Sequence, residues 1–387
     1  MMSSKQKVLI KASLPRLKQH LSVNTTSQHS GKEQVSFTSS ILAYADGIRN
    51  PSPEKALREE DLSAEFFAVA GQQVLASIRE IFGEEAIPGL IEAWDLTIRQ
   101  FTGLLIKHAS EGLRKADTAN QNSAWRYFCI RKIIKESQEV TSFYLSPADG
   151  AKINHFLPGQ YVSIRLFLPG MILSEPRQYS LSNSPNGSYY RISVKRESGT
   201  GASFNGRVSH CLFNVYQPGD IIEVAAPAGS FTLDTNRKVP VVLISGGVGQ
   251  TPLMSMAEHL VFSGSGRQIL WIHGSRNEAV HAFRKQIAEM AVRHKSFRPY
   301  IFYDRVNDRA GDIGLYQGVV DLPTLGADVI LPDADYYICG PTPFIKKQLH
   351  DLAVLGIRKE DIHIEDFGSA LVNCPPVSLN NTPILIP

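Results

Sequence analysis

Residues 240–252 read PVVLISGGVGQTP, and the interpretation of the whole chain starts from this stretch. Its β-branched apolar run at 241–244 predicts a short strand that is buried on both faces of a parallel sheet. The glycines that follow, Gly246, Gly247 and Gly249, allow a sharp turn and a close approach of a ligand to the backbone. Thr251 and Pro252 suit the first turn of a helix. The stretch therefore predicts a strand, a turn and a helix in succession.

Together, these three elements form a site for a diphosphate, because the free N–H groups and the dipole of a helix N-terminus both favour an anion. The pattern is not the GxGxxG fingerprint, since a Thr-Pro pair stands where the third glycine would be. A turn with a purely structural role is the alternative that this stretch alone leaves open.

The composition is that of a globular protein. The chain has 387 residues, 43% of them hydrophobic and 20% charged, which predicts two or three domains. No apolar run approaches the roughly 20 residues needed to cross a bilayer. The net charge is +3, and no basic cluster with interleaved aromatic residues is present. We therefore expect neither a membrane span nor a nucleic-acid partner.

The cysteines and the N-terminal residues bear on the compartment. The four cysteines are scattered and form no CxxC pair, which excludes a cysteine-only zinc site of usual spacing and fits a reducing compartment. We therefore expect no metal site and a cytoplasmic protein. The first acidic residue is Glu33, and six Lys or Arg residues precede it. This basic start is interpreted as a soluble first helix, and a mitochondrial transit peptide is the alternative.

Three patterns follow one another along the chain. Helical spacing dominates the first third, with a break or kink expected near Pro15. From Trp125 the period changes to two, and six short strands separated by turn residues predict a small antiparallel barrel. From Val241 strands alternate with helices, as in a doubly wound sheet. We predict a multidomain α+β protein made of an all-α region (1–122), an antiparallel β-barrel (123–236), a doubly wound α/β domain (237–368) and a disordered tail (369–387).

Two further motifs suit a phosphorylated ring cofactor. In Arg177-Gln178-Tyr179-Ser180, the arginine would neutralise phosphate, the tyrosine would lie against a ring and the serine would form a hydrogen bond. An ordinary strand is the alternative for this tetrapeptide. Gly206-Arg207-Val208-Ser209 opens a predicted helix and is a second candidate anion cradle.

The order of the motifs carries more information than any one of them. The glycine turn is followed by Cys339-Gly340-Pro341 at the end of a predicted strand, and then by Glu365-Asp366-Phe367-Gly368. In this order the motifs resemble the ferredoxin-reductase family of flavin reductases and, more narrowly, the reductase half of flavohemoglobins. The resemblance covers residues 125–368 and includes PGQY at 158–161, YRISVKRE at 190–197, PAG at 227–229 and WIHG at 271–274.

The resemblance implies FAD and a nicotinamide nucleotide, NADPH or NADH, as cofactors. It implies that FAD is bound by Tyr161, Arg177, Gln178, Tyr179, Ser180, Val208 and Ser209. It assigns the nucleotide to Gly247, Gly249, Thr251, Pro252, Ser275, Arg276, Cys339, Gly340 and Pro341. Phe367 would cover the flavin and, with Tyr179 and Ser180, form the catalytic set. Asp366 departs from the family, which usually has a cysteine there.

The choice between the two nucleotides depends on Ser275-Arg276-Asn277, which stands where the family meets the adenosine ribose. A guanidinium is a good bidentate partner for a 2′-phosphate, so Arg276 favours NADPH. The alternative is an exposed surface arginine.

The front third resembles a flavohemoglobin globin in fragments only. Eight globin helices of about 12 residues need more than the roughly 110 residues available here. No histidine lies between His29 and His108, and Phe67 and Ala109 stand where the family has the Tyr and Glu that orient its iron ligand. His108 lies in a sequence that resembles the iron-ligand segment, but an exposed helical histidine is the favoured interpretation. We therefore expect no haem.

The resemblance thus implies an FAD-dependent NAD(P)H oxidoreductase that passes electrons to an unidentified acceptor, which is a protein, a small molecule or dioxygen. A nitric oxide dioxygenase, which oxidises nitric oxide to nitrate with dioxygen, is the alternative if haem is retained. A non-catalytic flavin- or nucleotide-binding remnant is the third possibility.

Overall fold

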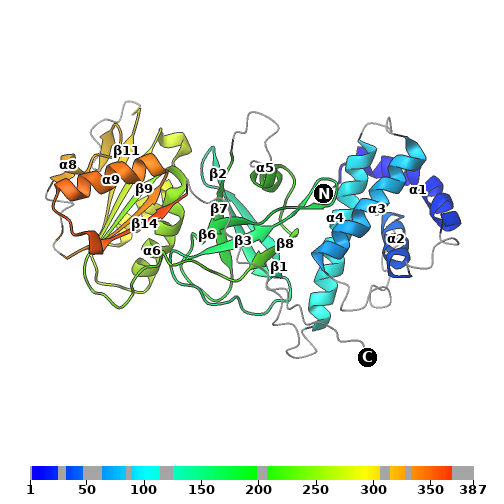
Figure 1. Cartoon of the computed structure of the whole chain (residues 1–387), viewed down its shortest axis with the longest axis horizontal. Coiled ribbons are helices and arrows are strands. Elements are labelled where there is room, and N and C mark those ends of the chain that lie inside the picture. Colours follow the sequence, from blue (N-terminus) through cyan, green and yellow to red (C-terminus); the bar gives the residue numbers. More distant parts are fainter. Residues whose placement is uncertain are drawn as a thin grey trace, which may run out of the picture.

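The computed structural model describes residues 2–24, 32–46, 63–83, 89–113, 125–197, 207–305, 314–326, 331 and 333–367, with backbone only for 20–24, 32–38 and 108–113. These residues form a helical region, a barrel and an α/β domain, which follow one another along the long axis of the molecule (Figure 1). The predicted tail, residues 369–387, lies outside the described residues.

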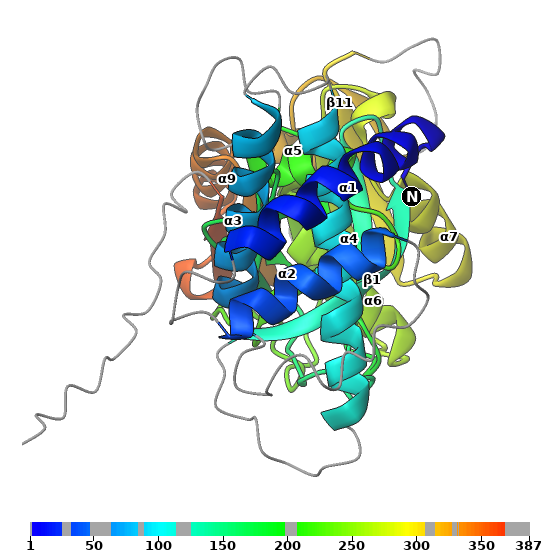
Figure 2. The same ribbon diagram turned by 90° about the vertical axis from the view of Figure 1, so that its right-hand side faces the viewer.

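The helical region consists of four helices in the described residues, each packed against the other three (Figure 2). They are α1 (Ser4–Asn24), α2 (Lys32–Ala45), α3 (Ala64–Phe82) and α4 (Leu90–Leu113). At their centre Trp94 is fully buried, and its Nε1 donates to the Oγ of Ser13 at 2.9 Å. α1 continues through Pro15, so the expected break is absent. Leu14 and Leu17 are buried in the core on either side of Pro15 and hold the helix in place despite the missing hydrogen bond.

The barrel is a six-stranded antiparallel sheet in the order β6-β3-β8-β1-β2-β7. It closes because Leu181, just after β6, pairs with Ile192 of β7. The alternating apolar residues predicted from the sequence point inward and form one core. The elements are β1 (Trp125–Lys135), β2 (Val140–Pro147), β3 (Tyr161–Arg165), β6 (Arg177–Ser180), β7 (Tyr190–Lys195), β8 (Ile221–Ala225), helix α5 (Arg207–Asn214) and a small hairpin of β4 (Phe167–Leu168) and β5 (Ile172–Leu173).

The α/β domain contains a six-stranded parallel sheet in the order β12-β11-β10-β9-β13-β14. α6 and α7 pack on one face, and α8 and α9 on the other, so successive residues of β9 enter different cores. The elements are β9 (Val241–Gly246), η4 (Gly247–Gly249), α6 (Gln250–Phe262), β10 (Ile269–Ser275), η5 (Glu278–Val280), α7 (Arg284–Arg293), β11 (Phe297–Tyr303), β12 (Leu315–Gln317), α8 (Leu322–Leu325), β13 (Asp335–Gly340), α9 (Thr342–Val354), η7 (Lys359–Asp361) and β14 (Ile362–Asp366).

This strand order fixes where a ligand binds. From β9 the chain builds the sheet outward through β10, β11 and β12, and it then returns to the other side of β9 with β13 and β14. The connections therefore change direction between β9 and β13. In open parallel sheets the ligand crevice lies at the carboxyl ends of the two strands at such a switch point. The glycine turn after β9 occupies this position.

The barrel and the helical region share a core. Met171, at the tip of the β4–β5 hairpin, is fully buried among the side chains of the helices. It lies directly over Gly71 of α3, where an added Cβ would come within 2.6 Å of its Cγ. The backbone N–H of Gly170 donates to the carboxylate of Asp95 on α4 at 2.9 Å. The hairpin is thus inserted between α3 and α4.

Candidate active site

The glycine turn after β9 packs tightly against the neighbouring strand. A Cβ on Gly249 would lie 2.3 Å from the carbonyl oxygen of Cys339, and a Cβ on Gly246 would lie 2.9 Å from the ring of Phe344. Gly247 has a positive φ of 57° and an open space beside it. α6 begins directly after the turn, and no side chain caps its N-terminus. The helix start therefore carries no side chain that would compete with an anionic ligand for the positive end of the α6 dipole.

The first two residues of α6 support this conclusion. Within the described part of the chain, the Oε1 atom of Gln250 is buried and has no hydrogen-bond partner. The hydroxyl of Thr251 donates to the carbonyl of Val248 at 3.0 Å, which closes the turn on itself. Buried polar atoms in native proteins are almost always satisfied, so the orphan oxygen beside the turn indicates a missing polar ligand.

The second wall of the crevice is formed by the ends of β13 and β14. Cys339 is paired in register with Ser245 of β9 on one side and with Glu365 on the other. Burial, together with the nearby carboxylates of Glu365 and Asp366, raises the pKa of the Cys339 thiol. This cysteine is therefore a neutral contact surface and not a thiolate nucleophile. Both carboxylate oxygens of Asp366 accept from the hydroxyl of Thr342, at 2.8 and 3.0 Å.

β6 carries the four predicted flavin contacts of the barrel. Its residues Arg177 to Ser180 pair in antiparallel register with Ile164 to Tyr161 of β3. Ser180 is buried and Gln178 is exposed. Burial raises the pKa of the Tyr179 phenol, so this ring is neutral near pH 7. The ring of Tyr161 lies against Gly229, where an added Cβ would come within 3.0 Å of it.

The second predicted anion cradle is also a helix start. α5 begins at Arg207, and Val208 and Ser209 are buried in its first turn. Phe367, directly after β14, is partly buried against the core beneath α6. Gly340 ends β13, and Pro341 precedes the first turn of α9.

The structure changes the interpretation of Arg276. Its guanidinium forms an ion pair with Glu139, which lies in the β1–β2 turn of the barrel. The hydroxyl of the neighbouring Ser275 is hydrogen-bonded to the Nε2 of His273 at 3.1 Å. The Nδ1 of His273 lies 2.8 Å from the Oγ of Ser245. Neither Glu139 nor His273 was predicted from the sequence as a site residue. WIHG at 271–274 marked the histidine only as part of a family motif.

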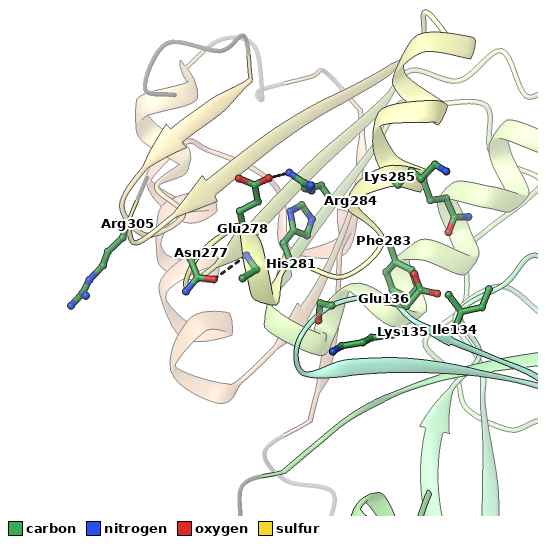
Figure 3. Close-up of a pocket in the computed structure, with 13 residues that line it drawn as sticks. Ile134, Lys135, Glu136, Asn277, Glu278, His281, Phe283, Arg284, Lys285 and Arg305 are labelled. Atoms are coloured by element: carbon green, nitrogen blue, oxygen red, sulfur yellow. Dashed lines mark hydrogen bonds and ion pairs between the residues drawn. The ribbon is translucent and has the colours of Figure 1, made fainter. Parts of the chain in front are cut away.

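A cavity of about 790 Å³ lies beside this corner, between the β1–β2 turn and the start of α7 (Figure 3). The sequence analysis did not predict it, because its walls come from segments about 140 residues apart. Within the described residues, no three His, Cys, Asp or Glu side chains gather in an arrangement that could hold a metal ion.

A closed antiparallel barrel followed by a parallel α/β domain, with a glycine turn at the switch point and an Arg-x-Tyr-Ser strand on the barrel, defines a flavin-dependent oxidoreductase of the ferredoxin-reductase type. The comparisons with known proteins agree. The family model described as an oxidoreductase NAD-binding domain matches residues 243–349. Within the described residues no helix is long and apolar enough to cross a membrane.

Three relatives place the chain more closely. A flavohemoprotein from Bordetella pertussis is 41% identical over an alignment of 403 positions, gaps included, which covers 95% of this chain and 99% of the relative. The FAD/NAD-binding domain of a nitric oxide dioxygenase from Vibrio cholerae superposes with a TM-score of 0.56 at 38% identity, over 62% of this chain and 98% of that one. A flavohemoglobin from Malassezia yamatoensis, whose structure contains FAD and heme, shares the fold over 95% of this chain and 99% of its own (TM-score 0.55, 23% identity).

The chain belongs to the flavohemoprotein family, and the resemblance inferred from the ordered motifs is confirmed. The predicted fold class is confirmed as well. The roles assigned to individual site residues and the domain boundaries stay predictions.

Proposed function

We propose that the protein uses NAD(P)H to reduce FAD and passes the electrons to an acceptor other than haem. The observation that carries the nucleotide half of this proposal is the uncapped start of α6, where Gly249 is pressed against Cys339 and the buried Oε1 of Gln250 has no partner in the described residues. A nicotinamide nucleotide suits both features, because the helix dipole favours its diphosphate and its ribose hydroxyls can donate to an unpartnered acceptor.

On the barrel side, the residues present fit FAD. Tyr179 offers a neutral ring, Ser180 a hydroxyl and Arg177 a cation from the single strand β6, and Val208 and Ser209 lie in the first turn of α5. Tyr161 and Gln178 flank this strand. Bound together, the flavin and the nicotinamide would supply the hydride-transfer chemistry, and the protein supplies orientation and electrostatics.

On the α/β side, we assign the nucleotide diphosphate to the turn at Gly247 and Gly249 and to the helix start at Thr251 and Pro252. Cys339, Gly340 and Pro341 form the wall on which the nicotinamide rests. Cys339 stays a thiol because burial raises its pKa, so it adds no charge that would compete with the ring. Phe367 follows β14 directly and closes the same end of the crevice.

The described side chains of the helical region do not fit haem. The Bordetella alignment spans 403 positions, whereas 95% of this chain is about 368 residues, so the relative carries about 35 residues that this chain lacks. Side chains are described for residues 2–19, 39–46, 63–83 and 89–107 of this region, and none of them is a histidine or a cysteine. Trp94 fills the centre of the four helices. We therefore propose no electron transfer from the flavin to iron, and the acceptor is a protein, a small molecule or dioxygen.

The second candidate is a nitric oxide dioxygenase, which the names of the flavohemoprotein and nitric oxide dioxygenase relatives favour. An absorption spectrum of protein expressed with a haem precursor separates the two candidates. Flavin bands alone support the proposal, and an added Soret band in stoichiometric amount overturns it in favour of the dioxygenase. Rapid anaerobic bleaching of the flavin by NADPH or NADH is expected in both cases, and its absence would leave only a non-catalytic binding module.

We further propose a cytoplasmic location. Ile10, Leu14 and Leu17 of the basic first helix are buried in the core of the helical region, so a cleaved mitochondrial leader would remove part of that core. Unprocessed protein of full mass in the cytosolic fraction of its host checks this point.

A further inference from the structure

The hairpin of β4 and β5 continues the pair of strands that carries most of the predicted flavin contacts. Leu166 alone separates β3 from β4, and residues 174–176 separate β5 from β6. The two chains stay joined across this gap. The N–H of Ser174 donates to the carbonyl of Leu166 at 2.8 Å, and the N–H of Leu166 donates to the Oγ of Ser174 at 3.0 Å. We call residues 161–180 the flavin ribbon, with Tyr161 and β6 at one end and the tip, residues 169–171, at the other.

Two helices of the helical region hold the tip of the flavin ribbon. The carboxylate of Asp95 on α4 accepts the N–H of Gly170 at 2.9 Å, and the Nε2 of Gln72 on α3 donates to the carbonyl of Met171 at 3.4 Å. The side chain of Met171 is fully buried among the apolar side chains of the helices, directly over Gly71. Both the backbone and the side chain of the tip are therefore bound by the helices.

The backbone of the tip adopts a strained conformation. Met171 has a left-handed φ of 56°, which is unfavourable for a residue with a Cβ atom, whereas its neighbour Gly170 adopts its φ of 86° freely. A strained residue of this kind persists only where its surroundings determine its conformation. The contacts with α3 and α4 are therefore what maintains this turn.

Further contacts fix the flavin ribbon between its tip and its strands. The guanidinium of Arg165, the last residue of β3, pairs with Glu65 in the first turn of α3 at 2.8 Å and with Glu223 of β8 at 2.5 Å. The hydroxyl of Tyr216, two residues beyond α5, donates to the carbonyl of Phe167 at 3.1 Å and accepts its N–H at 3.0 Å. Because the hairpin is bonded to β8 and to the end of α5, a movement of its tip is carried into the barrel.

We propose that α3 and α4 position the flavin strand β6 through this ribbon, with Asp95 and Met171 as the positioning residues. The proposal rests on the proposed function, because FAD is the ligand assigned to β6. It gives the helical region a part in flavin binding that requires no haem and no direct contact between a helix and the flavin. Without the tip contacts, the strained turn relaxes and the side chains of Arg177, Tyr179 and Ser180 leave the geometry that fits the cofactor.

The first test measures the affinity of the full-chain apoprotein for FAD, without any nucleotide. Asp95→Ala removes the acceptor of the Gly170 N–H, and Met171→Ala removes the buried side chain. Each is expected to weaken FAD binding about ten-fold, the effect of one lost hydrogen bond. Asp95→Asn keeps an oxygen that can accept from Gly170, and Met171→Leu keeps the apolar volume, so both should bind FAD within about two-fold of the wild type.

Two of the variants separate positioning from stability. Leu17→Ala creates a cavity in the core of the helical region, on α1, and should destabilise that region without removing a contact of the tip. Asp95→Asn leaves the buried guanidinium of Arg99 without its charged partner, so it should lose stability as well. Urea unfolding measures these losses, and both variants are expected to keep the FAD affinity of the wild type.

Hydrogen exchange of the FAD-free protein gives a second measurement that does not depend on the cofactor. The amides of β6, residues 177–180, should exchange at least about ten-fold faster in Asp95→Ala and Met171→Ala than in Leu17→Ala, because the strand opens locally. Residues 241–246 of β9 lie outside the flavin ribbon and should exchange alike in all three variants.

An unchanged FAD affinity in both Asp95→Ala and Met171→Ala overturns the proposal. An equal loss of affinity in Leu17→Ala also overturns it, because the effect would then be general destabilisation. If neither NADPH nor NADH reduces the flavin while FAD affinity still follows the tip contacts, the proposed function fails and the positioning by α3 and α4 stands. If the protein takes up no FAD, the proposed function fails, and faster exchange of β6 in the tip variants still supports the positioning, whereas equal exchange overturns it.

Discussion

The guanidinium of Arg191 donates to the carboxylate of Glu258 at 2.7 Å across the boundary between the barrel and the α/β domain. Arg191 lies on β7 and Glu258 on α6, and each side chain is only 6% exposed. Their remaining polar atoms are also satisfied. Arg191 contacts the carbonyl and the hydroxyl of Ser182, and the second oxygen of Glu258 accepts the N–H of Ser184 at 2.7 Å. Because α6 starts at the glycine turn, this pair fixes that turn relative to the barrel.

Arg191→Met is therefore expected to slow the reduction of the flavin by ten- to a hundred-fold, because a misplacement of about 1 Å between reacting groups costs that much. FAD content should stay near one per chain, since Arg191 is not among the predicted flavin contacts. Anaerobic stopped-flow absorption of the oxidised flavin measures the rate. Lys195→Met, on the same strand but exposed, is the control.

A double variant distinguishes positioning from plain stability. Removing one partner of a buried pair leaves an uncompensated charge, whereas replacing both by apolar residues is often neutral. Arg191→Met combined with Glu258→Met should therefore recover the free energy of unfolding but not the reduction rate. Recovery of both would mean that the pair only stabilises the fold.

Gly249→Ala is expected to lower the free energy of unfolding of the α/β domain by about 2 kcal/mol or more, because the new Cβ would overlap the backbone carbonyl of Cys339, which no rotamer change can relieve. Nucleotide affinity should fall with it. Gly266→Ala serves as the comparison, since no atom lies within 4 Å of its added Cβ. Urea titration and calorimetry give the two quantities, and a Gly249→Ala protein as stable as Gly266→Ala would refute the packing argument.

Asp95→Ala is expected to loosen the joint between the helical region and the barrel at a cost of about 3 kcal/mol. Asp95 pairs with Arg99 at 2.9 Å, and both side chains are largely buried, so its removal leaves an unpaired buried cation and the unpaired N–H of Gly170. Asp46→Ala, which breaks an exposed pair with Lys18, should cost less than about 1 kcal/mol. Limited proteolysis at the joint and urea unfolding measure the loss of stability in the two variants. Equal losses would mean that the contacts of Asp95 do not stabilise the joint.

Stability should fall as the pH drops below about 6.5. Burial lowers the pKa of His281 to about 4, whereas an unfolded histidine titrates near 6.5. Between these values the unfolded chain binds the additional proton, so the stabilisation is present above pH 6.5 and is lost toward pH 4. From pH 7.5 to 5.5 the loss from this residue is about 1.4 kcal/mol.

His281→Gln should reduce that pH dependence, and His273, whose pKa burial also lowers, should account for part of what remains. The fluorescence of Trp271, fully buried in β10, reports on this domain in a background where Trp94 and Trp125 are replaced by Phe. An unchanged slope between pH 7.5 and 5.5 in His281→Gln would contradict the assignment.

Local patterns in the sequence predicted most of the fold. Apolar alternation placed the barrel strands, and the run at Val241 with its glycines placed the switch point, because these signals depend only on neighbouring residues. Several short elements, among them β5, β12 and α8, were not predicted, since two to four residues carry too little periodicity. The expected break at Pro15 is absent because tertiary packing outweighs a local preference, and the alternative of a kink there stays a prediction.

The site was harder to predict wherever it depends on distant pairs. Arg276 and Glu139 are 137 residues apart, and nothing near either one indicates the other. The same holds for Arg191 with Glu258, and for the cavity that Lys135 and Asn277 both line. A single sequence shows which residue types are present at a strand end, but not which of them another domain neutralises.

Because the tip of the β4–β5 hairpin is buried among them, the helices of the helical region have a structural role that is independent of any prosthetic group. Met171 packs directly over Gly71, and without α3 and α4 its apolar surface would face water. A deletion that removed α3 or α4 would therefore expose Met171. The four helices therefore cover this part of the barrel whether or not the region binds haem.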